Sequence, residues 1–271
     1  MSGATRKTIT VEAYKRIYDD TQKHAGEYDI EQSEKVLDDV IVFDRSKNSD
    51  SMRVLAIHEN PFSAAIDIWG RCVKNGSTSK YKIGVVQCAN QMYPVVNGEG
   101  GAAIGAQGFE YELLRISNLN VTLDGNFYPM LDGVIVCPTI TIFKSPSPDY
   151  SYIENPTPVT AFFLPCQRRP DIISIDSVDE YLNTNDKKKM QQQIDNIFIL
   201  AQMYSINTLI ISDFGTDIAH EHPIKKVIEM FNEALKKYRV SRVIFAVKRS
   251  PADAESDKVF MQYHTGIVRH V

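Results

Sequence analysis

The chain has few of the features that mark a disulfide-stabilised or metal-binding protein. It holds four cysteines among 271 residues, and none of them stands in a CxxC pair. Three of the four lie in or beside apolar, strand-like runs, so we interpret all of them as reduced core residues: Cys72, Cys88, Cys137 and Cys166. We predict no metal site and no cofactor.

Long hydrophobic runs are also missing. No window reaches the roughly 18 uninterrupted apolar residues that a membrane span needs. The first residues, MSGATRKTIT, lack the apolar core of a secretory signal. We therefore expect a cytoplasmic or nuclear protein, in the host cytosol if the gene is viral, and no membrane partner.

A strong charge of one sign is absent as well. The net charge is −4 and the isoelectric point is near 5.9, which argues against a broad basic surface for duplex nucleic acid. A short lysine run at 187–189 is typical of a solvated helix surface. The hydrophobic content of 43% and the charged content of 24% are ordinary for a soluble globular protein.

Apolar strand-like runs alternate with amphipathic segments along the chain. The pattern predicts strands at 35–44, 52–57, 81–89, 133–143, 158–165, 207–215 and 241–249. It predicts helices at 10–26, 61–71, 109–116 and 222–240, and one or two more within 176–206. The turn-rich segment 144–157 is expected to be an exposed loop. Continuous apolar strands between helices indicate an α/β fold, a three-layer α/β/α sandwich whose mixed sheet has helices on both faces.

Two loops in this pattern are candidate ligand sites. One lies within NGEGGAAIGAQGFEYELLR, residues 97–115, where five glycines separate a buried strand from a helix. The other is SDFGTDIAHEHP, residues 212–223. Ligands of α/β sheets bind beyond the carboxyl ends of the strands, where backbone N–H groups point outward. Neither loop has the spacing of a P-loop or of a Rossmann turn, so glycine content alone leaves a tight loop without a ligand as an equal alternative.

The first loop resembles the signature of the microbial-type poly(ADP-ribose) glycohydrolases, a branch of the macrodomain fold. That family has an Asn-Pro-Gly-Gly-Gly loop, then Gly-Ala and a Gln-Glu-Glu triplet. Aligned on Arg115, the matching positions are Asn97, Gly100, Gly101, Gly105 and Ala106. Glu99 replaces one loop glycine, and Phe109, Glu110 and Tyr111 stand at the triplet. DGVIVCPTITIFK and the 212–223 loop are similar to the family's Ser-Pro-containing strand and its second phosphate loop.

The resemblance implies a macrodomain-like domain over residues 1–271, with a core at about 51–250 and residues 1–50 as a family-type extension. It implies a diphosphate held by backbone N–H groups and a glutamate acting as general acid or base. The catalytic candidates are Glu110, which matches a family position, Tyr111 and Glu112. The implied ligand-binding residues are Asn90, Asn97, Gly100, Gly101, Gly105, Ala106, Phe214, Gly215, Thr216, Asp217 and Phe260.

Several departures leave alternatives open. Tyr111 is a poor base at neutral pH, and Asp217 brings a negative charge to the phosphate loop. Glu110 and Glu112 could instead be solvated helix-surface acids. His220, Glu221 and His222 fit helix capping and surface charge better than a metal site, and Phe260 is an adenine-stacking candidate or an apolar anchor. We therefore rank a protein that binds ADP-ribose or a related nucleotide, with weak or lost hydrolase activity, ahead of an active hydrolase using Glu110. A structural or assembly protein that binds protein partners through 144–157 is the third hypothesis.

Overall fold

The computed structural model describes residues 9–49, 51–95, 101–106, 108–217, 219–248 and 254–267. Within these residues a seven-stranded sheet has the order β1-β4-β5-β3-β8-β9-β2. The strands are β1 (Glu34–Val36), β2 (Arg53–Ile57), β3 (Ile83–Cys88), β4 (Val134–Lys144), β5 (Tyr152–Leu164), β8 (Thr208–Ile211) and β9 (Arg242–Ala246).

The sheet is mixed. Strands β5, β3, β8, β9 and β2 run parallel to one another, whereas β4 is antiparallel to β5 and β1 is antiparallel to β4. The carboxyl ends of five neighbouring strands therefore lie along one edge of the sheet, which is where the candidate site lies.

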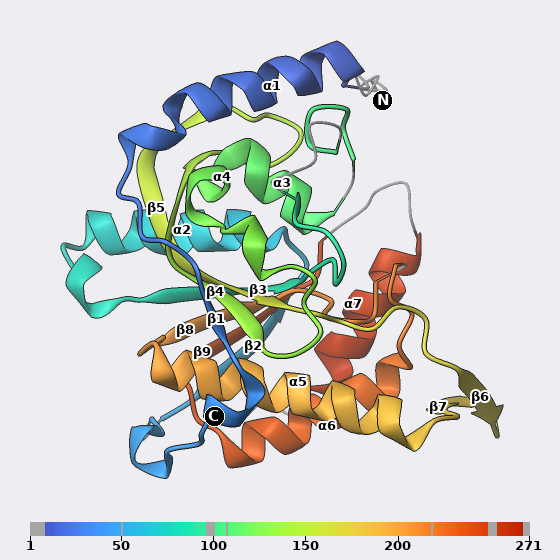
Figure 1. The fold of residues 1–271 in the computed structure, drawn as a ribbon. Helices are drawn as coiled ribbons and strands as arrows, with labels where there is room; N and C mark the ends of the chain where they lie inside the picture. The colour runs from blue at the N-terminus through green and yellow to red at the C-terminus, as the bar shows by residue number, and fades with distance from the viewer. Residues whose placement is uncertain are drawn as a thin grey trace, which may run out of the picture.

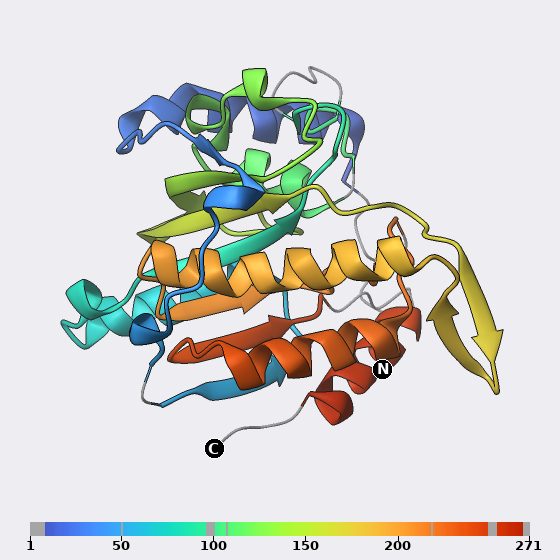
Figure 2. The same cartoon turned by 60° about the horizontal axis from the view of Figure 1, so that its bottom comes forward.

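Helices cover both faces of the sheet (Figures 1 and 2). One face carries α2 (Pro61–Lys74), α3 (Phe109–Ile116) and α4 (Leu119–Thr122), and α1 (Val11–His24) packs over α3. The other face carries α5 (Thr184–Met203), α6 (Ile224–Lys237) and α7 (Ala254–Gly266). Short 3-10 turns occur at Ala25–Glu27, Asp38–Val40, Arg45–Lys47, Thr78–Lys80 and Gly125–Phe127. This arrangement confirms the predicted three-layer α/β/α fold.

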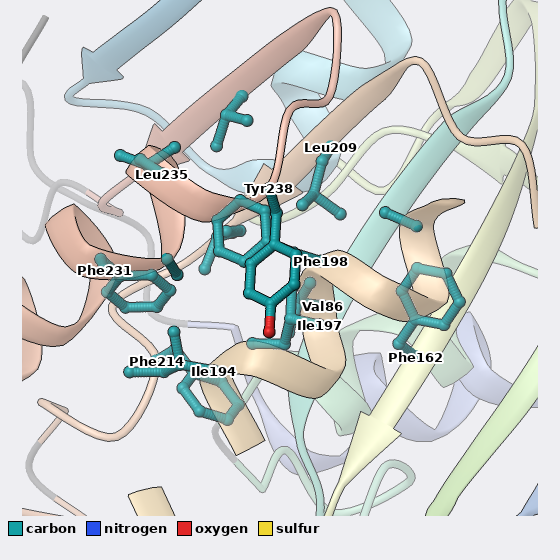
Figure 3. Close-up of a cluster of buried hydrophobic side chains, with 14 of the residues drawn as sticks. Val86, Phe162, Ile194, Ile197, Phe198, Leu209, Phe214, Phe231, Leu235 and Tyr238 are labelled. Atoms are coloured by element: carbon teal, nitrogen blue, oxygen red, sulfur yellow. The ribbon is translucent and has the colours of Figure 1, made fainter. Parts of the chain in front are cut away.

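Alternating side chains of the strands supply two apolar cores. Val85 and Phe163 join the core beneath α2 and α3, while their neighbours Val86 and Phe162 join the core beneath α5 and α6. Figure 3 shows Val86, Phe162 and Leu209 of the strands facing residues of the α5 and α6 layer. Both faces of the central strands are therefore buried, as their continuous apolar sequences predict.

Four sequence predictions need correction. The predicted strand 35–44 is only the short β1, because its aspartates Asp38 and Asp39 enter a 3-10 turn. The predicted loop 144–157 is mostly strand: β4 ends at Lys144 and β5 begins at Tyr152, so the connection is confined to 145–151. The first part of the predicted helical region 176–206 is strand β7 (Val178–Tyr181), and the predicted helix 222–240 begins only at Ile224.

Strand β7 pairs with β6 (Ile172–Ile175) in a hairpin that the sequence analysis missed. The hairpin extends away from the sheet (Figures 1 and 2), and three of its isoleucines are exposed: Ile172, Ile173 and Ile175. Helix α5 starts only after it, at the cap formed when Asn183 Oδ1 accepts a hydrogen bond from Asn185 N. Among the described residues, no helix is both long and apolar enough to cross a bilayer.

Candidate functional site

The candidate site is built from segments that follow the carboxyl ends of parallel strands. Asn90 follows β3, Cys166 follows β5 and Asp213 follows β8. Because β3 lies between β5 and β8, these three segments begin next to one another. This is the edge at which the sequence places both glycine-bearing loops.

The described part of the first loop, residues 101–106, is held by a buried arginine. Arg115 is 2% exposed. Its Nε donates a hydrogen bond to Ala102 O at 2.8 Å, and its second terminal nitrogen donates to Ala106 O at 2.7 Å. The guanidinium also lies 4.7 Å from the ring centre of Tyr14 on α1. Arg115 therefore fixes the loop that contains the predicted residues Gly101, Gly105 and Ala106; Asn97 and Gly100 lie outside the described residues.

Two glycines of this loop are required by their neighbours. Gly105 has φ +83°, and a side chain there would overlap the ring of Tyr14. A side chain at Gly101 would overlap the ring of Tyr111. Tyr111 is half-buried and packs on the same apolar core as Phe109. The ring of Tyr111 therefore packs against Gly101 and supports the 101–106 loop.

Glu110 is the buried acid at the strand edge. It is 9% exposed, and its Oε2 accepts a hydrogen bond from Asn90 N at 3.2 Å. Its Oε1 is buried with no hydrogen-bond partner among the described residues. Burial raises the pKa of Glu110 to about 7, against the lowering effects of the Asn90 hydrogen bond and of the charges on His220 and Arg168. The half-buried Tyr128 shares this environment, because the Glu110 charge adds to the effect of burial in raising the pKa of its hydroxyl.

Glu112 is also buried, at 3% exposure, but its carboxylate is fully engaged. Oε2 accepts hydrogen bonds from Asn60 Nδ2 at 3.0 Å and Lys248 Nζ at 3.2 Å, and Oε1 accepts one from Ser147 N at 2.9 Å. These donors come from three segments far apart in the chain, so Glu112 is a structural connector. The alternative that Glu110 and Glu112 are solvated surface acids is wrong.

The second loop is closed on itself. Gly215 N donates to Cys88 Sγ at 3.3 Å, and Thr216 N donates to Asp213 O at 2.8 Å. Cys88 belongs to β3, whereas the N–H groups of Ala219, His220, Glu221 and His222 donate to acceptors within the loop. A phosphate bound by backbone N–H groups needs these donors to point outward. In this conformation these six N–H groups are not available to a phosphate.

The charge of Asp217 is balanced within the same loop. Its Oδ1 accepts a hydrogen bond from Ala219 N at 2.8 Å, and its Oδ2 lies 2.6 Å from His220 Nδ1. Burial raises the pKa of Asp217, but the hydrogen bond and charge of His220 outweigh it, so the net pKa is lowered. Burial, together with the charge of Asp217, raises the pKa of the neighbouring Asp213 to about 6. The negative charge that the sequence placed in this loop is therefore paired rather than open to a ligand.

Two cysteines and the same histidine gather beneath the loop. Candidate ligand atoms of Cys88, Cys166 and His220 all lie within 4.8 Å of one another. The hydrogen bond with Cys88 lowers the pKa of the Cys166 thiol, whereas burial raises that of Cys88. Spacing in the sequence could not reveal this group, because the three residues follow three different strands.

Two of the predicted ligand-binding residues are aromatic and contact other rings of the protein. Phe214 is fully buried and its ring packs against Phe231 of α6. Phe260 on α7 stacks on His58, with ring centres 4.5 Å apart and planes 5° apart, and also contacts His264. Adenine stacking by Phe260 stays a prediction, and His58 covers one face of the ring.

Sequence reasoning missed two contributors to the site. Arg168 is exposed just after β5. Its charge opposes the rise in the pKa of Glu110 that burial causes. It also opposes the net rise in the pKa of His220, where burial lowers the pKa but the Asp217 hydrogen bond and nearby negative charges together outweigh it. A cavity of about 320 Å³ lies beside the same edge and is lined by Gln91, Gln167, Lys189 and His222 among others. No local motif marks either feature, since both arise where separate strands end.

Comparison with solved structures shows what this fold is similar to. A poly(ADP-ribose) glycohydrolase from Thermomonospora curvata matches with a TM-score of 0.71 and 15% identity, covering 93% of this chain and 99% of that chain. The same enzyme bound to the inhibitor ADP-HPD matches with a TM-score of 0.69 and 14% identity, over 92% and 98% of the two chains. A poly(ADP-ribose) glycohydrolase from Deinococcus radiodurans in complex with ADP-ribose matches with a TM-score of 0.62 and 16% identity, over 90% and 92%.

The chain therefore has the fold of these glycohydrolases over nearly its whole length, as the glycine-loop resemblance predicts. No family model and no curated protein sequence matches the chain. Identities of 14–16% show the fold alone.

Proposed function

We propose that the chain binds ADP-ribose or a related nucleotide at the carboxyl edge of β3 and β8, with weak or no glycohydrolase turnover. The observation that carries the proposal is the incomplete hydrogen bonding of the buried Glu110 carboxyl group. A buried carboxyl group with an unpartnered oxygen among the described residues is costly unless a ligand completes its hydrogen bonds. With a pKa near 7 it can donate or accept a hydrogen bond, which suits a ribose hydroxyl.

Weak turnover follows from what surrounds Glu110. Tyr111 packs on Gly101 and Glu112 is held by three donors, so neither supplies a second acid to the edge. Six described N–H groups of the second loop are bonded within the protein, so they are not free to hold a diphosphate, and the exposed Arg168 is a cation close enough to lower the Glu110 pKa. We also infer that residues 1–50 belong to the same unit as the core, because Thr21 of α1 donates a hydrogen bond to Arg115 O.

Calorimetric titration with ADP-ribose tests the binding proposal. We expect heat with the native protein and an affinity about tenfold lower in Glu110→Gln, because one charge-assisted hydrogen bond is lost. Glu233→Gln, an exposed glutamate of α6 paired with Lys236, is the matched control and should bind as the native protein does. No heat at millimolar ADP-ribose would contradict the proposal and favour a structural or assembly role.

An active glycohydrolase is the second candidate, and the pKa of Glu110 favours it. A carboxyl group with a pKa near the working pH is matched to general acid–base catalysis. Release of ADP-ribose from poly(ADP-ribose) separates the two candidates. Rapid release by the native protein that is abolished in Glu110→Gln would make Glu110 the working acid and replace the weak-turnover proposal.

A further inference from the structure

Three metal-ligating side chains from three separate segments meet under the second loop. Cys88 ends β3, Cys166 follows β5 and His220 lies in the loop after β8. Their candidate ligand atoms lie within 4.8 Å of one another. We propose that Cys88, Cys166 and His220 bind a Zn²⁺ ion that fastens this loop to the sheet edge.

The separations fit a zinc site after a small adjustment. Bonds of about 2.0 Å to nitrogen and about 2.3 Å to sulfur in a tetrahedron place ligand atoms roughly 3.3–3.8 Å apart. The ligand atoms now lie up to 4.8 Å apart, so the side chains must move by about 1 Å to reach the spacing of a tetrahedral zinc site. Two thiolates and one imidazole are ligands that zinc prefers, and three protein ligands leave a fourth position for water or an external ligand.

The neighbours of the three ligands are those that a zinc site needs. Asp217 Oδ2 lies 2.6 Å from His220 Nδ1, which orients the ring and leaves Nε2 as the metal-binding atom. Gly215 N donates a hydrogen bond to Cys88 Sγ at 3.3 Å, an interaction that stabilises a thiolate. His222 Nε2 lies 4.0 Å from Cys166 Sγ, and its ring is held by the Tyr181 hydroxyl and by Gln167 O.

Burial also favours a metal. Cys166 is 2% exposed and His220 is 6% exposed, so the polar atoms of this group are largely removed from water. Cys88 and Cys166 are both free cysteines, so both thiols are available to a metal. Zinc would use all three side chains and would link β3, the segment after β5 and the loop after β8.

Metal analysis of the full chain, independent of ADP-ribose binding, tests the proposal. Protein purified under reducing conditions without chelator, then freed of metal and reconstituted with Zn²⁺, should retain about one zinc per chain after desalting. The cobalt-substituted protein should show the visible absorption of tetrahedral Co²⁺ and thiolate-to-metal charge transfer. The proposed zinc site would be overturned if the protein retained no zinc. It would also be overturned if the spectrum of the cobalt-substituted protein lacked thiolate-to-metal bands.

Variants locate the site. Cys166→Ser and His220→Gln should lose stoichiometric zinc, and Asp217→Asn should lower zinc affinity about 10–100-fold through the orientation of His220. Cys72→Ser alters a buried thiol of α2, outside the cluster, and should keep full zinc content. The proposal is contradicted if Cys72→Ser loses as much zinc as the cluster variants. It is also contradicted if mass spectra show a Cys88–Cys166 disulfide that persists in protein purified under reducing conditions. The cobalt spectrum of the native chain decides the matter even if a variant fails to fold.

Discussion

Glu110 and Glu112 stand two residues apart on the first turns of α3, and both are buried, yet their surroundings differ. Glu112 is bound by three donors from separate segments. Glu110 has one backbone donor, an unpartnered oxygen among the described residues and a pKa raised to about 7. The helix is the same, so the difference comes from what the rest of the chain brings to each position.

This comparison separates a buried carboxylate whose hydrogen bonds are complete from one whose hydrogen bonds are incomplete. A buried acid whose bonds are all made stabilises the fold and has nothing left to offer a ligand. A buried acid that is only partly bonded destabilises the fold, and in the proposed function a ligand completes its hydrogen bonds. The account therefore predicts opposite effects on stability when the two residues are changed.

The largest effect is expected for Glu112→Ala. The change leaves Asn60 Nδ2, Ser147 N and Lys248 Nζ without their acceptor and should lower the free energy of unfolding by about 4 kcal/mol. Urea denaturation at pH 7 measures it. Glu233→Ala, at an exposed ion pair of α6, should change stability by less than about 0.5 kcal/mol. Equal small effects from both changes would show that Glu112 is not a connector.

Glu110→Gln should have the opposite sign and depend on pH. The unfolded carboxyl loses its proton near its ordinary pKa of 4.5, whereas the folded one keeps it up to about pH 7. The unfolded state then binds fewer protons over this interval, so the native protein loses stability as pH rises from 4.5 to 7. Glutamine avoids this loss. The variant should be more stable than the native protein by up to about 3 kcal/mol at pH 8 and equal to it at pH 4.

Denaturation curves of both proteins at the two pH values check this expectation. A difference that stays constant with pH would mean that Glu110 has an ordinary pKa, and the contrast with Glu112 would then disappear.

The smallest effect is expected for Tyr128→Phe. The Tyr128 hydroxyl is buried without a hydrogen-bond partner among the described residues. Its removal costs no bond of the free protein, so stability should stay within about 1 kcal/mol of the native value. If the hydroxyl joins Glu110 in binding, affinity for ADP-ribose should fall severalfold in calorimetry. Unchanged affinity would show that the Tyr128 hydroxyl does not contact the ligand.

Much of the fold was predictable from the sequence because the strands carry continuous apolar runs. Within the predicted strands 81–89, 133–143, 207–215 and 241–249, the apolar residues with at most 1% exposure include Val134, Val136, Cys137, Ile210 and Phe245. Cys88, at the end of β3, is half-buried. The β6–β7 hairpin was missed because its sequence, IISIDSVDEY, exposes isoleucines on a two-stranded unit that has no core of its own. The periodicity of apolar residues predicts a strand only where one face is buried, and little of this hairpin is buried.

The site was predictable only in part. The motif resemblance selected Glu110, and the glycine pattern located a loop whose shape Arg115 and Tyr14 require. The sequence could not show that Glu112 accepts hydrogen bonds from Asn60, Ser147 and Lys248. It also could not show that His220 lies beside Cys88 and Cys166. Each of these groupings joins residues from different strand ends, and no local sequence pattern encodes such contacts.

The most direct test of the central claim is a ¹³C NMR titration of the glutamate side-chain carboxyl groups, with the Glu110 signal assigned by its loss in Glu110→Gln. The account predicts a midpoint near pH 7 for Glu110 in the free protein and a change in that midpoint when ADP-ribose is added. A midpoint near 4.5 that ADP-ribose leaves unchanged would contradict the claim that Glu110 is the ligand-binding acid of this fold.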